Sequence, residues 1–517
     1  MTSGKGPMLP QVKTQKRVKL IPPDGGWGWM VLLGTATSNV FNQSMLSLFG
    51  LLYGDAIEAM GYNTQGAALV LSTMIFVSNF GGPIAGVLLK LTSARFTAVT
   101  GACMCTLGIF FSGFATSLWH LVATYGLLLG FGLGFIQNSS FVSINLYFKL
   151  KKSRAVGLAN VGTGVGQSLM PHVVRYLLDN YGFQGACIIL GGLSLNGICG
   201  TLLLQPIEWH MKKVEEDVVV DESMQLLQNR KNSVTSGNES GTVVYSNVQR
   251  RSTEPGLVVD KNDNTKHVFW SQKHLNGKTC KNITANGNNT SHKATPAGDK
   301  TIWQKMYDLF DISLLSSFRF VNIIVGIAIF GVSINNFSLI YPFFLQKVAH
   351  MTKHQTAVCM SAIAIADIAG RLIVPIFQDK YQIRARWVLL VSSVWLLVVR
   401  QILAFQTDMS VLIILSCLYG VGRSSLIVSR NLAISESVQI DQVPSAVGLG
   451  MLVMCFLIPP SYWFLGWIRD YTGSYLICLT AQNVFIVLFL LMWVPDMLYT
   501  WCKERNSKAL VDEVAMS

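Results

Sequence analysis

The sequence predicts an all-α membrane protein. Hydrophobic residues make up 51% of its 517 residues and charged residues only 13%, whereas a soluble chain carries about a quarter charged residues. Apolar runs of 20 or more residues recur along the chain, and a helix needs about 20 such residues to cross a bilayer. An ordinary soluble core is therefore a poor interpretation of this composition.

The net charge of +13 does not indicate a nucleic-acid partner, because the excess lies in short patches beside apolar runs. Cytoplasmic loops of membrane proteins have this pattern. Most of the ten cysteines lie inside apolar runs, where we interpret them as small packing residues. The sequence has no CxxC or Cys/His metal spacing, so we expect no metal site and no cofactor.

Twelve apolar runs fall into two sets of six around a polar linker. This is the plan of the major facilitator fold, in which two six-helix bundles alternate access to a central site, although other transporters also have twelve helices. The expected spans are 27–52, 66–90, 96–117, 120–146, 155–178 and 182–204, then 318–345, 355–378, 386–406, 409–431, 445–467 and 474–496. The expected domains are a basic cytosolic tail (1–21), a first bundle (22–204), a cytosolic disordered linker (205–315), a second bundle (316–497) and a cytosolic tail (498–517).

Basic residues in the loops predict the orientation. The turns after the second, fourth and eighth spans are basic and fall on one side together with the basic amino tail. The positive-inside rule makes that side cytoplasmic, and an even number of spans places the carboxyl tail there too. Lys347 and Lys353 lie on the predicted outside and run against the pattern. The amino tail has no apolar core of a signal peptide, so we expect the first span to stay in the membrane.

The linker is rich in Asn, Ser, Thr, Lys and Gly, and its charges nearly cancel. Such a segment buries too little apolar surface to fold by itself. On the predicted topology its glycosylation sequons face the cytosol and stay unmodified. The sequons are at Asn238, Asn282, Asn288 and Asn289, and serines beside Arg250 and Arg251 form a weak phosphorylation motif.

Several spans are dense in small residues, as in "GGPIAG" from Gly81, "GFGLGF" from Gly130 and "GLANVGTGVG" from Gly157. Small residues let helix backbones approach closely. This pattern fits helices that rock against one another and equally fits static packing, so both interpretations stay open. The "GFGLGF" segment lies within a span and follows no strand, so it is not a nucleotide loop.

Asp367 and Arg371 in the eighth span are the clearest functional candidates. They are four residues apart, so they share a helical face, and ionisable residues inside a membrane are costly and usually functional. Arg371 needs an anion, which Asp367 supplies at rest and a substrate carboxylate could replace. Protonation of Asp367 would then free Arg371 for substrate. The alternative is a purely structural ion pair.

Other polar residues in the spans have two interpretations. Arg423 either lines the path or has a structural role, whereas Arg400 and Arg430 are expected near span ends, with their charges at the interface. His172 is expected to be a packed neutral histidine. The remaining candidates for the path, which could instead bridge helices, are Asn39, Ser47, Asn138, Asn335, Asn336 and Tyr341.

The first span begins with "PPDGGWGW" from Pro22. We expect Asp24 to accept hydrogen bonds from the exposed N–H groups at the start of this helix, where the helix dipole favours negative charge. Trp27 and Trp29 suit the membrane interface. The segment is therefore expected to anchor the end of the helix rather than to contact substrate.

These motifs together resemble the monocarboxylate transporter family (solute carrier family 16) of the major facilitator superfamily. "DGGWGW" resembles its first signature, and "YFKLKKSRAVGLANVGTGVG" resembles its second, although Leu150 interrupts the basic cluster. The eighth-span Asp367 and Arg371 match its charged pair. The signature residues are Asp24, Gly25, Gly26, Trp27, Gly28, Trp29, Tyr147, Phe148, Gly157 and Gly162.

The resemblance implies a plasma-membrane transporter of small monocarboxylates such as lactate and pyruvate, often moved with a proton. It assigns substrate binding to Arg371 and proton coupling to Asp367. Some members carry amino acids, iodothyronines or creatine instead, and some need a single-span glycoprotein to reach the surface. Membrane lipid and a small organic acid are thus the expected partners.

One departure bears on the cargo. The proton-coupled lactate carriers of the family have a lysine late in the first span, and ungapped counting places Ser47 there. A hydroxyl does not titrate near neutral pH. A proton-independent facilitator therefore stays open beside a symporter that couples through Asp367. A receptor or sensor with a transporter fold is a further alternative. An enzyme is not expected, because no nucleophile–base spacing or phosphate loop is present in the sequence.

Overall fold

The computed structural model describes residues 13–62, 64–220 and 302–516, and it forms two units. One unit contains Met1–Pro23 with Ile207–Phe269, and the other contains Asp24–Pro206 with Trp270–Ser517. The sequons and the linker serines lie outside the described residues.

The smaller unit contains an antiparallel pair of strands, β1 (Lys13–Ile21) and β2 (Lys212–Val220). They lie within the expected tail and linker, where the sequence predicted no strand. The register places Lys16 opposite Asp217 and Arg17 opposite Glu216. Sequence reasoning treated the two segments separately, so it could not detect that they pair.

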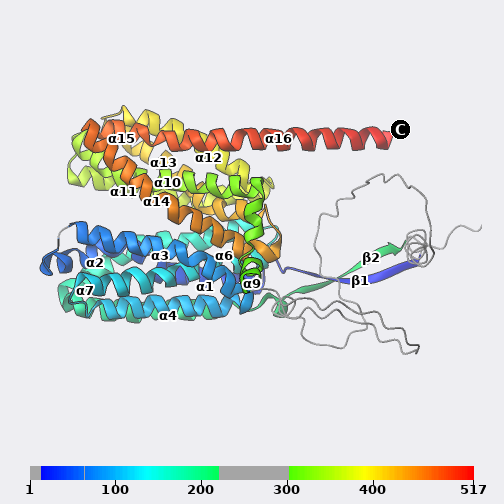
Figure 1. The fold of residues 1–517 in the computed structure, drawn as a ribbon, viewed down its shortest axis with the longest axis horizontal. Coiled ribbons are helices and arrows are strands. Elements are labelled where there is room, and N and C mark those ends of the chain that lie inside the picture. Colours follow the sequence, from blue (N-terminus) through cyan, green and yellow to red (C-terminus); the bar gives the residue numbers. More distant parts are fainter. Residues whose placement is uncertain (1–12, 63, 221–301, 517) are drawn as a thin grey trace, which may run out of the picture. The chain divides into compact units, whose positions relative to one another are not determined.

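The larger unit is helical, as predicted, and its first half runs from α1 to α7 (Figure 1). A π-helical segment, η1, interrupts the first predicted span. The elements are α1 (Trp27–Ser38), η1 (Asn39–Gln43), α2 (Met45–Ala59), α3 (Thr64–Leu91), α4 (Ala94–Ser112), α5 (Leu118–Leu121), η2 (Val122–Leu129), α6 (Gly130–Tyr147) and α7 (Lys152–Leu202).

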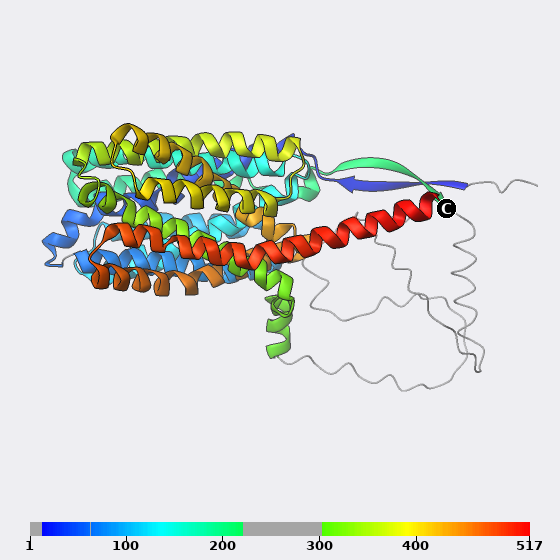
Figure 2. The same ribbon diagram turned by 90° about the horizontal axis from the view of Figure 1, so that it is seen from above.

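The second half of this unit runs from α9 to α16 (Figures 1 and 2). Its first two elements fall within the expected linker. The elements are α9 (Ile302–Leu309), η4 (Ile312–Ser316), α10 (Phe318–Lys347), α11 (Lys353–Lys380), α12 (Ala385–Ala404), α13 (Met409–Ser435), η5 (Ile440–Gln442), α14 (Val443–Thr472), α15 (Tyr475–Ala481) and α16 (Asn483–Met516).

The helices confirm a multi-pass membrane protein. In the described part of the chain, 10 helices are long and apolar enough to cross a membrane. One of them, α7, has 51 residues and is kinked at Gly182, whose φ of 66° is not helical, so it accounts for the fifth and sixth predicted spans. The interrupted α1–η1–α2 segment is the first span. The twelve predicted passes are thereby accounted for.

Glycines set the closest helix contacts, both within and between the halves. A Cβ added to Gly162 in α7 would collide with the carbonyl oxygen of Ala36 in α1. Between the halves, one added to Gly86 in α3 would lie 2.6 Å from the carbonyl oxygen of Pro444 in α14. Close backbone approach of this kind requires small residues, so the glycine-rich spans serve tight packing in this conformation.

Arg400 differs from its expected place near a span end. Its side chain is 0% exposed, so it does not reach the interface. The guanidinium donates to the hydroxyl of Ser333 at 2.7 Å and to its carbonyl oxygen at 3.0 Å. It also lies 4.7 Å from the centre of the Phe337 ring and 5.3 Å from that of Tyr419. The Arg400 guanidinium is therefore stabilised inside the second half by a hydroxyl, a carbonyl oxygen and two aromatic rings, which take the place of water.

Candidate functional site

The site is built around Asp367 and Arg371 on α11. This helix starts with a capping box, in which Thr352 and Gln355 satisfy each other's backbone N–H groups. One turn of helix brings the two side chains together, and Arg371 Nη2 lies 2.5 Å from Asp367 Oδ2. Asp367 is 4% exposed and Arg371 3%. The predicted pair is thus a buried ion pair.

Arg371 also reaches the other half of the unit. Its Nη1 donates to the carbonyl oxygen of Asn160 in α7 at 2.6 Å. Gly157 makes this approach possible, because a Cβ there would collide with the carbonyl oxygen of Arg371 itself. The signature glycine of α7 therefore supports the position of the arginine on α11.

The hydrogen-bonding capacity of the Asp367–Arg371 pair is only partly used. Asp367 Oδ1 and Arg371 Nε are both buried and have no hydrogen-bond partner among the described residues. A guanidinium can bind a carboxylate through two parallel hydrogen bonds, whereas this pair uses one. A buried unpaired donor costs about 1–3 kcal/mol. The site therefore keeps both a donor and an acceptor for another group.

Arg423 on α13 adds a second positive charge beside the pair. Gly370 lies against Ser424, and Gly420 lies against the backbone of Asp367, so α11 and α13 are closely packed. Arg423 is near enough to Arg371 to repel it electrostatically. Its Nε is buried without a partner, and it forms no ion pair among the described residues. The centre therefore carries an excess of positive charge.

Three other predicted site residues form bonds between helices. Asn39 in η1 donates to the carbonyl oxygen of Ala159 at 2.8 Å. Tyr341 in α10 shares a 2.7 Å hydrogen bond with the hydroxyl of Ser416 in α13. Asn138 in α6 donates to the carbonyl oxygens of Gly82 and Pro444, at 3.0 and 3.2 Å, and its Oδ1 stays buried without a partner. The side chain of Ser47 lies outside the described residues.

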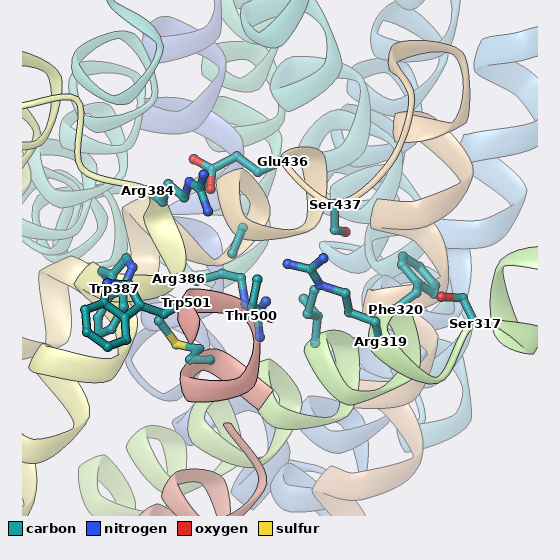
Figure 3. A pocket seen from close by; sticks show the side chains of 13 residues that line it. Ser317, Arg319, Phe320, Arg384, Arg386, Trp387, Glu436, Ser437, Thr500 and Trp501 are labelled. Atoms are coloured by element: carbon teal, nitrogen blue, oxygen red, sulfur yellow. The ribbon is translucent and has the colours of Figure 1, made fainter. Parts of the chain in front are cut away.

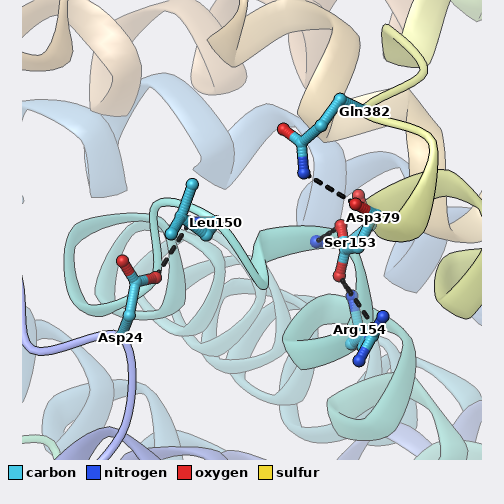
Figure 4. Close-up of polar contacts among 6 residues, drawn as sticks. All are labelled: Asp24, Leu150, Ser153, Arg154, Asp379 and Gln382. Carbon is cyan, nitrogen blue, oxygen red and sulfur yellow. Dashed lines mark hydrogen bonds and ion pairs between the residues drawn. The ribbon is translucent and has the colours of Figure 1, made fainter.

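The first signature contacts the second signature. Asp24 Oδ1 accepts the backbone N–H of Lys149 at 2.6 Å and that of Leu150 at 2.9 Å (Figure 4). The expectation that Asp24 caps its own helix was wrong, since α1 has Gly26 as N-cap and no side-chain cap bond. Asp24 has a φ of 47°. That backbone conformation directs the chain toward the loop between α6 and α7, whose N–H groups lack helical partners.

Aromatic residues complete this contact between the signatures. Trp29 meets Phe148 edge to face with ring centres 5.5 Å apart, and a Cβ added to Gly28 would lie 3.0 Å from Phe148 Cζ. Tyr147 is buried and donates to the carbonyl oxygen of Gln205 at 3.1 Å. Trp27 donates to the carbonyl oxygen of Leu203 at 3.3 Å. These residues join the ends of α1, α6 and α7.

A second polar cluster joins the two halves and was not found from the sequence. Asp379, near the end of α11, accepts the backbone N–H groups of Ser153 and Arg154 at the start of α7, at 3.2 and 2.9 Å (Figure 4). Arg154 Nε also lies 3.6 Å from Asp379. The N-cap of α7 is Lys151, which makes no cap bond with its side chain. We call this cluster the α7–α11 latch. In the sequence, this cluster was indicated only by Asp379, an acidic residue next to the basic loop after the eighth predicted span.

Residues 32–461 match the family model of the Major Facilitator Superfamily. Similar curated proteins include monocarboxylate transporter 12-B of Danio rerio, 31% identical over 37% of this chain and 40% of the relative. Human monocarboxylate transporter 11 is 34% identical over 35% of this chain and 39% of the relative. The chain thus spans about two fifths of the length of these relatives. Monocarboxylate transporter 9 of Gallus gallus is 22% identical over 94% of this chain and 96% of the relative.

Solved structures with the same fold include the proton:xylose symporter XylE, bound to 6-bromo-6-deoxy-D-glucose. The TM-score is 0.56 at 11% identity, covering 91% of this chain and 95% of XylE. The E. coli fucose:proton symporter FucP has a TM-score of 0.54 at 12% identity, covering 90% of this chain and 96% of FucP. These matches confirm the predicted fold, and the relatives agree with a transporter rather than an enzyme.

Proposed function

The chain belongs to the major facilitator superfamily, and from this premise we propose that it is a secondary transporter of monocarboxylates or related small carboxylate-bearing solutes. The observation that carries the proposal is the buried Asp367–Arg371 pair with Arg423 beside it. An excess of positive charge at this centre favours an anion, as do the buried Nε atoms of Arg371 and Arg423, which have no hydrogen-bond partner among the described residues. The curated relatives bear the name monocarboxylate transporter, which agrees with that chemistry.

In the proposed cycle, Arg371 binds the carboxylate of the cargo. In the absence of cargo, the carboxylate that pairs with Arg371 is that of Asp367, whose Oδ2 lies 2.5 Å from Arg371 Nη2. A proton on Asp367 removes the negative charge of that partner, so that Arg371 exchanges it for the cargo carboxylate. Arg423 stabilises the bound anion from α13. This coupling makes uptake rise as pH falls.

Alternating access requires the halves to separate at the end that is now closed. The α7–α11 latch and the contact of Gly86 with Pro444 lie at the end that carries the basic loops. Lys90 of α3 forms an ion pair with Asp311 of the second half at the same end. We propose that these contacts break when the carrier opens to this side and form again when it opens to the other.

A proton-independent facilitator is the second candidate. The α1 and η1 segments contain no Asp, Glu, Lys, Arg or His, and Ser47 stands where the resemblance leads us to expect a lysine. With a single acidic residue in the centre, Arg371 could exchange Asp367 for cargo without net proton movement. Cargo resembling an amino acid, a thyroid hormone or creatine belongs to this candidate.

We also propose that the protein resides in the plasma membrane with both termini in the cytosol. The basic loops after the second, fourth and eighth spans support the orientation of the termini, whereas the plasma membrane is what the family resemblance implies. Two six-helix bundles then join through a cytosolic linker at 205–315. A single-span glycoprotein that escorts the carrier is a proposal from the resemblance, and it is tested by surface expression with and without a coexpressed partner.

Uptake of labelled carboxylates into cells tests the function and separates the two candidates. The panel should include lactate, pyruvate, an aromatic amino acid and creatine, at about pH 6 and about pH 7.5. Faster carboxylate uptake at the lower pH supports symport, and equal uptake supports facilitation. If no member of the panel enters cells with normal surface expression, the transporter proposal fails and the receptor alternative gains support.

A further inference from the structure

The second half contains a cavity of about 440 Å³ that the proposed transport site does not use. It lies between the first residues of α10 and α12, the end of α13 and the middle of α16 (Figure 3). Its volume is within the range of about 300–1,000 Å³ that is typical of small-molecule sites. Glu436, which lines it, follows Arg423 by thirteen residues, or roughly 20 Å of helix. The cavity is therefore separate from the transport centre.

The lining of this cavity is basic. Arg319, Arg384 and Arg386 line it, with Glu436 as the acidic residue (Figure 3). Both carboxylate oxygens of Glu436 accept the backbone N–H of Ala385, each at 3.1 Å. Glu436 thus holds the start of α12, and its single negative charge, which also acts on Arg384 and Arg386, faces three arginines. The lining thus has an excess of positive charge.

Arg386 is the buried member of the lining. It is 8% exposed, and its Nη2 forms an ion pair with Asp496 of α16. Its guanidinium lies 5.1 Å from the centre of the Trp493 ring. Its Nε, however, is buried without a hydrogen-bond partner among the described residues. A buried charged donor without a partner is costly, so an anion in the cavity would satisfy a group that the protein leaves open.

Aromatic residues surround the charged lining. Trp387 and Trp501 line the cavity and are 37% and 48% exposed. Arg505 lies 5.5 Å from the centre of the Trp501 ring. Tryptophans collect at the level of lipid headgroups, and basic pockets between membrane helices bind phosphorylated headgroups. The arrangement therefore combines a basic lining with exposed tryptophans at its rim.

We propose that this cavity binds a phosphate-bearing anion through Arg319, Arg384 and Arg386. The tryptophan rim favours the headgroup of an anionic phospholipid over a free phosphate compound. A bound headgroup would link α10, α12, α13 and α16 at the end where the second half carries its basic residues, and it would thereby stabilise this half. The site is independent of the cargo chemistry proposed above.

Binding can be measured on the purified full-length protein in nanodiscs. Discs of phosphatidylcholine alone are compared with discs that also contain phosphatidylinositol 4,5-bisphosphate or phosphatidylserine, by melting temperature and by native mass spectrometry of retained lipid. Inositol trisphosphate and inorganic phosphate are added separately to phosphatidylcholine discs. Stabilisation only by the anionic lipids supports a headgroup, and equal stabilisation by the soluble anions supports a free phosphate compound.

Matched variants locate the binding. Arg319→Gln removes an exposed lining charge, and Arg386→Gln removes the buried one. We expect each to weaken anion binding by about tenfold or more, because each loses a charge-assisted hydrogen bond. Arg95→Gln, the same change in α4 of the first half, should leave binding unchanged. The proposal is overturned if no phosphate-bearing anion binds, or if Arg319→Gln, which does not disturb the ion pair of Arg386, binds as well as the unmodified protein.

Discussion

At the residue scale, Asp367 and Arg371 differ from an ordinary structural ion pair. A structural pair is best satisfied when every donor and acceptor has a partner, whereas here Asp367 Oδ1 and Arg371 Nε have none among the described residues. The incomplete pairing leaves capacity for a second carboxylate. This capacity can be tested by substitutions that keep charge or shape.

Arg371→Lys keeps the positive charge but loses the planar guanidinium, which can donate two parallel hydrogen bonds to one carboxylate. We expect carboxylate uptake to fall by about tenfold or more, because lysine does not bind a carboxylate bidentately. Initial rates of uptake, normalised to surface expression, measure the effect. Arg175→Lys, an exposed arginine of α7, is the matched control. Normal uptake by Arg371→Lys would show that two-pronged binding is not needed.

Asp367→Asn removes the group that is proposed to carry the proton while keeping its shape. Uptake by this variant should lose its dependence on pH, because Arg371 no longer has a titrating partner. The measurement is the initial rate of carboxylate uptake at several pH values between about 6 and about 7.5, the range over which proton coupling is tested. Asp55→Asn, at an exposed position of α2, should keep the pH dependence. A variant whose uptake still rises at low pH would exclude Asp367 as the coupling residue.

At the element scale, helix ends are joined by acids that lie far away in the sequence. Asp24 binds the loop before α7, and Asp379 binds the first N–H groups of α7 itself. The start of a helix leaves N–H groups without partners, so an acid from another segment can satisfy them. The first contact joins two family signatures, and the second joins the two halves.

Asp379→Ala removes the α7–α11 latch. A lost helix cap costs about 0.5–2 kcal/mol, so the equilibrium should shift toward the form that is open at this end. Ser445→Cys, at a position that is 3% exposed at the start of α14, reports on opening. We expect its labelling by a maleimide, read by site-resolved mass spectrometry, to become several-fold faster in the Asp379→Ala background.

The control for the latch is Asp408→Ala, which changes an exposed acid at the start of α13. It should leave labelling of the reporter unchanged. Equal labelling rates in both backgrounds would mean that the latch does not hold the halves together.

At the scale of the whole unit, glycines decide how closely the halves approach. Gly157 lies against the backbone of Arg371, and Gly86 lies against that of Pro444. These contacts join helices of different halves at the basic end. The residues that a sequence marks only as small therefore determine whether this end can close.

Gly157→Ala should prevent the observed closure, because the added Cβ meets a backbone oxygen that cannot move aside. Overpacking of this kind costs about 1–3 kcal/mol. We expect uptake to fall together with the melting temperature. Gly50→Ala in α2, where a Cβ meets nothing within 4 Å, is the matched control. If both variants transport normally, close approach at Gly157 is not required for the cycle.

The sequence by itself determined the helical membrane fold, the number of passes and the pair on α11. These follow from local patterns: the length of the apolar runs and a spacing of four residues on one helix. The first signature was also evident, but its contact was not, since Asp24 binds a loop more than a hundred residues away.

Only the tertiary structure decided what the buried polar groups contact. Arg400 looked like a residue near a span end, yet it is fully buried among Ser333, Phe337 and Tyr419. The latch at Asp379 and the basic cavity at Arg386 likewise combine residues from separate helices. Local patterns report which side chains cost free energy when buried, because that cost depends on residue type. Which groups offset it depends on how distant helices pack, and no segment of the sequence contains that information alone.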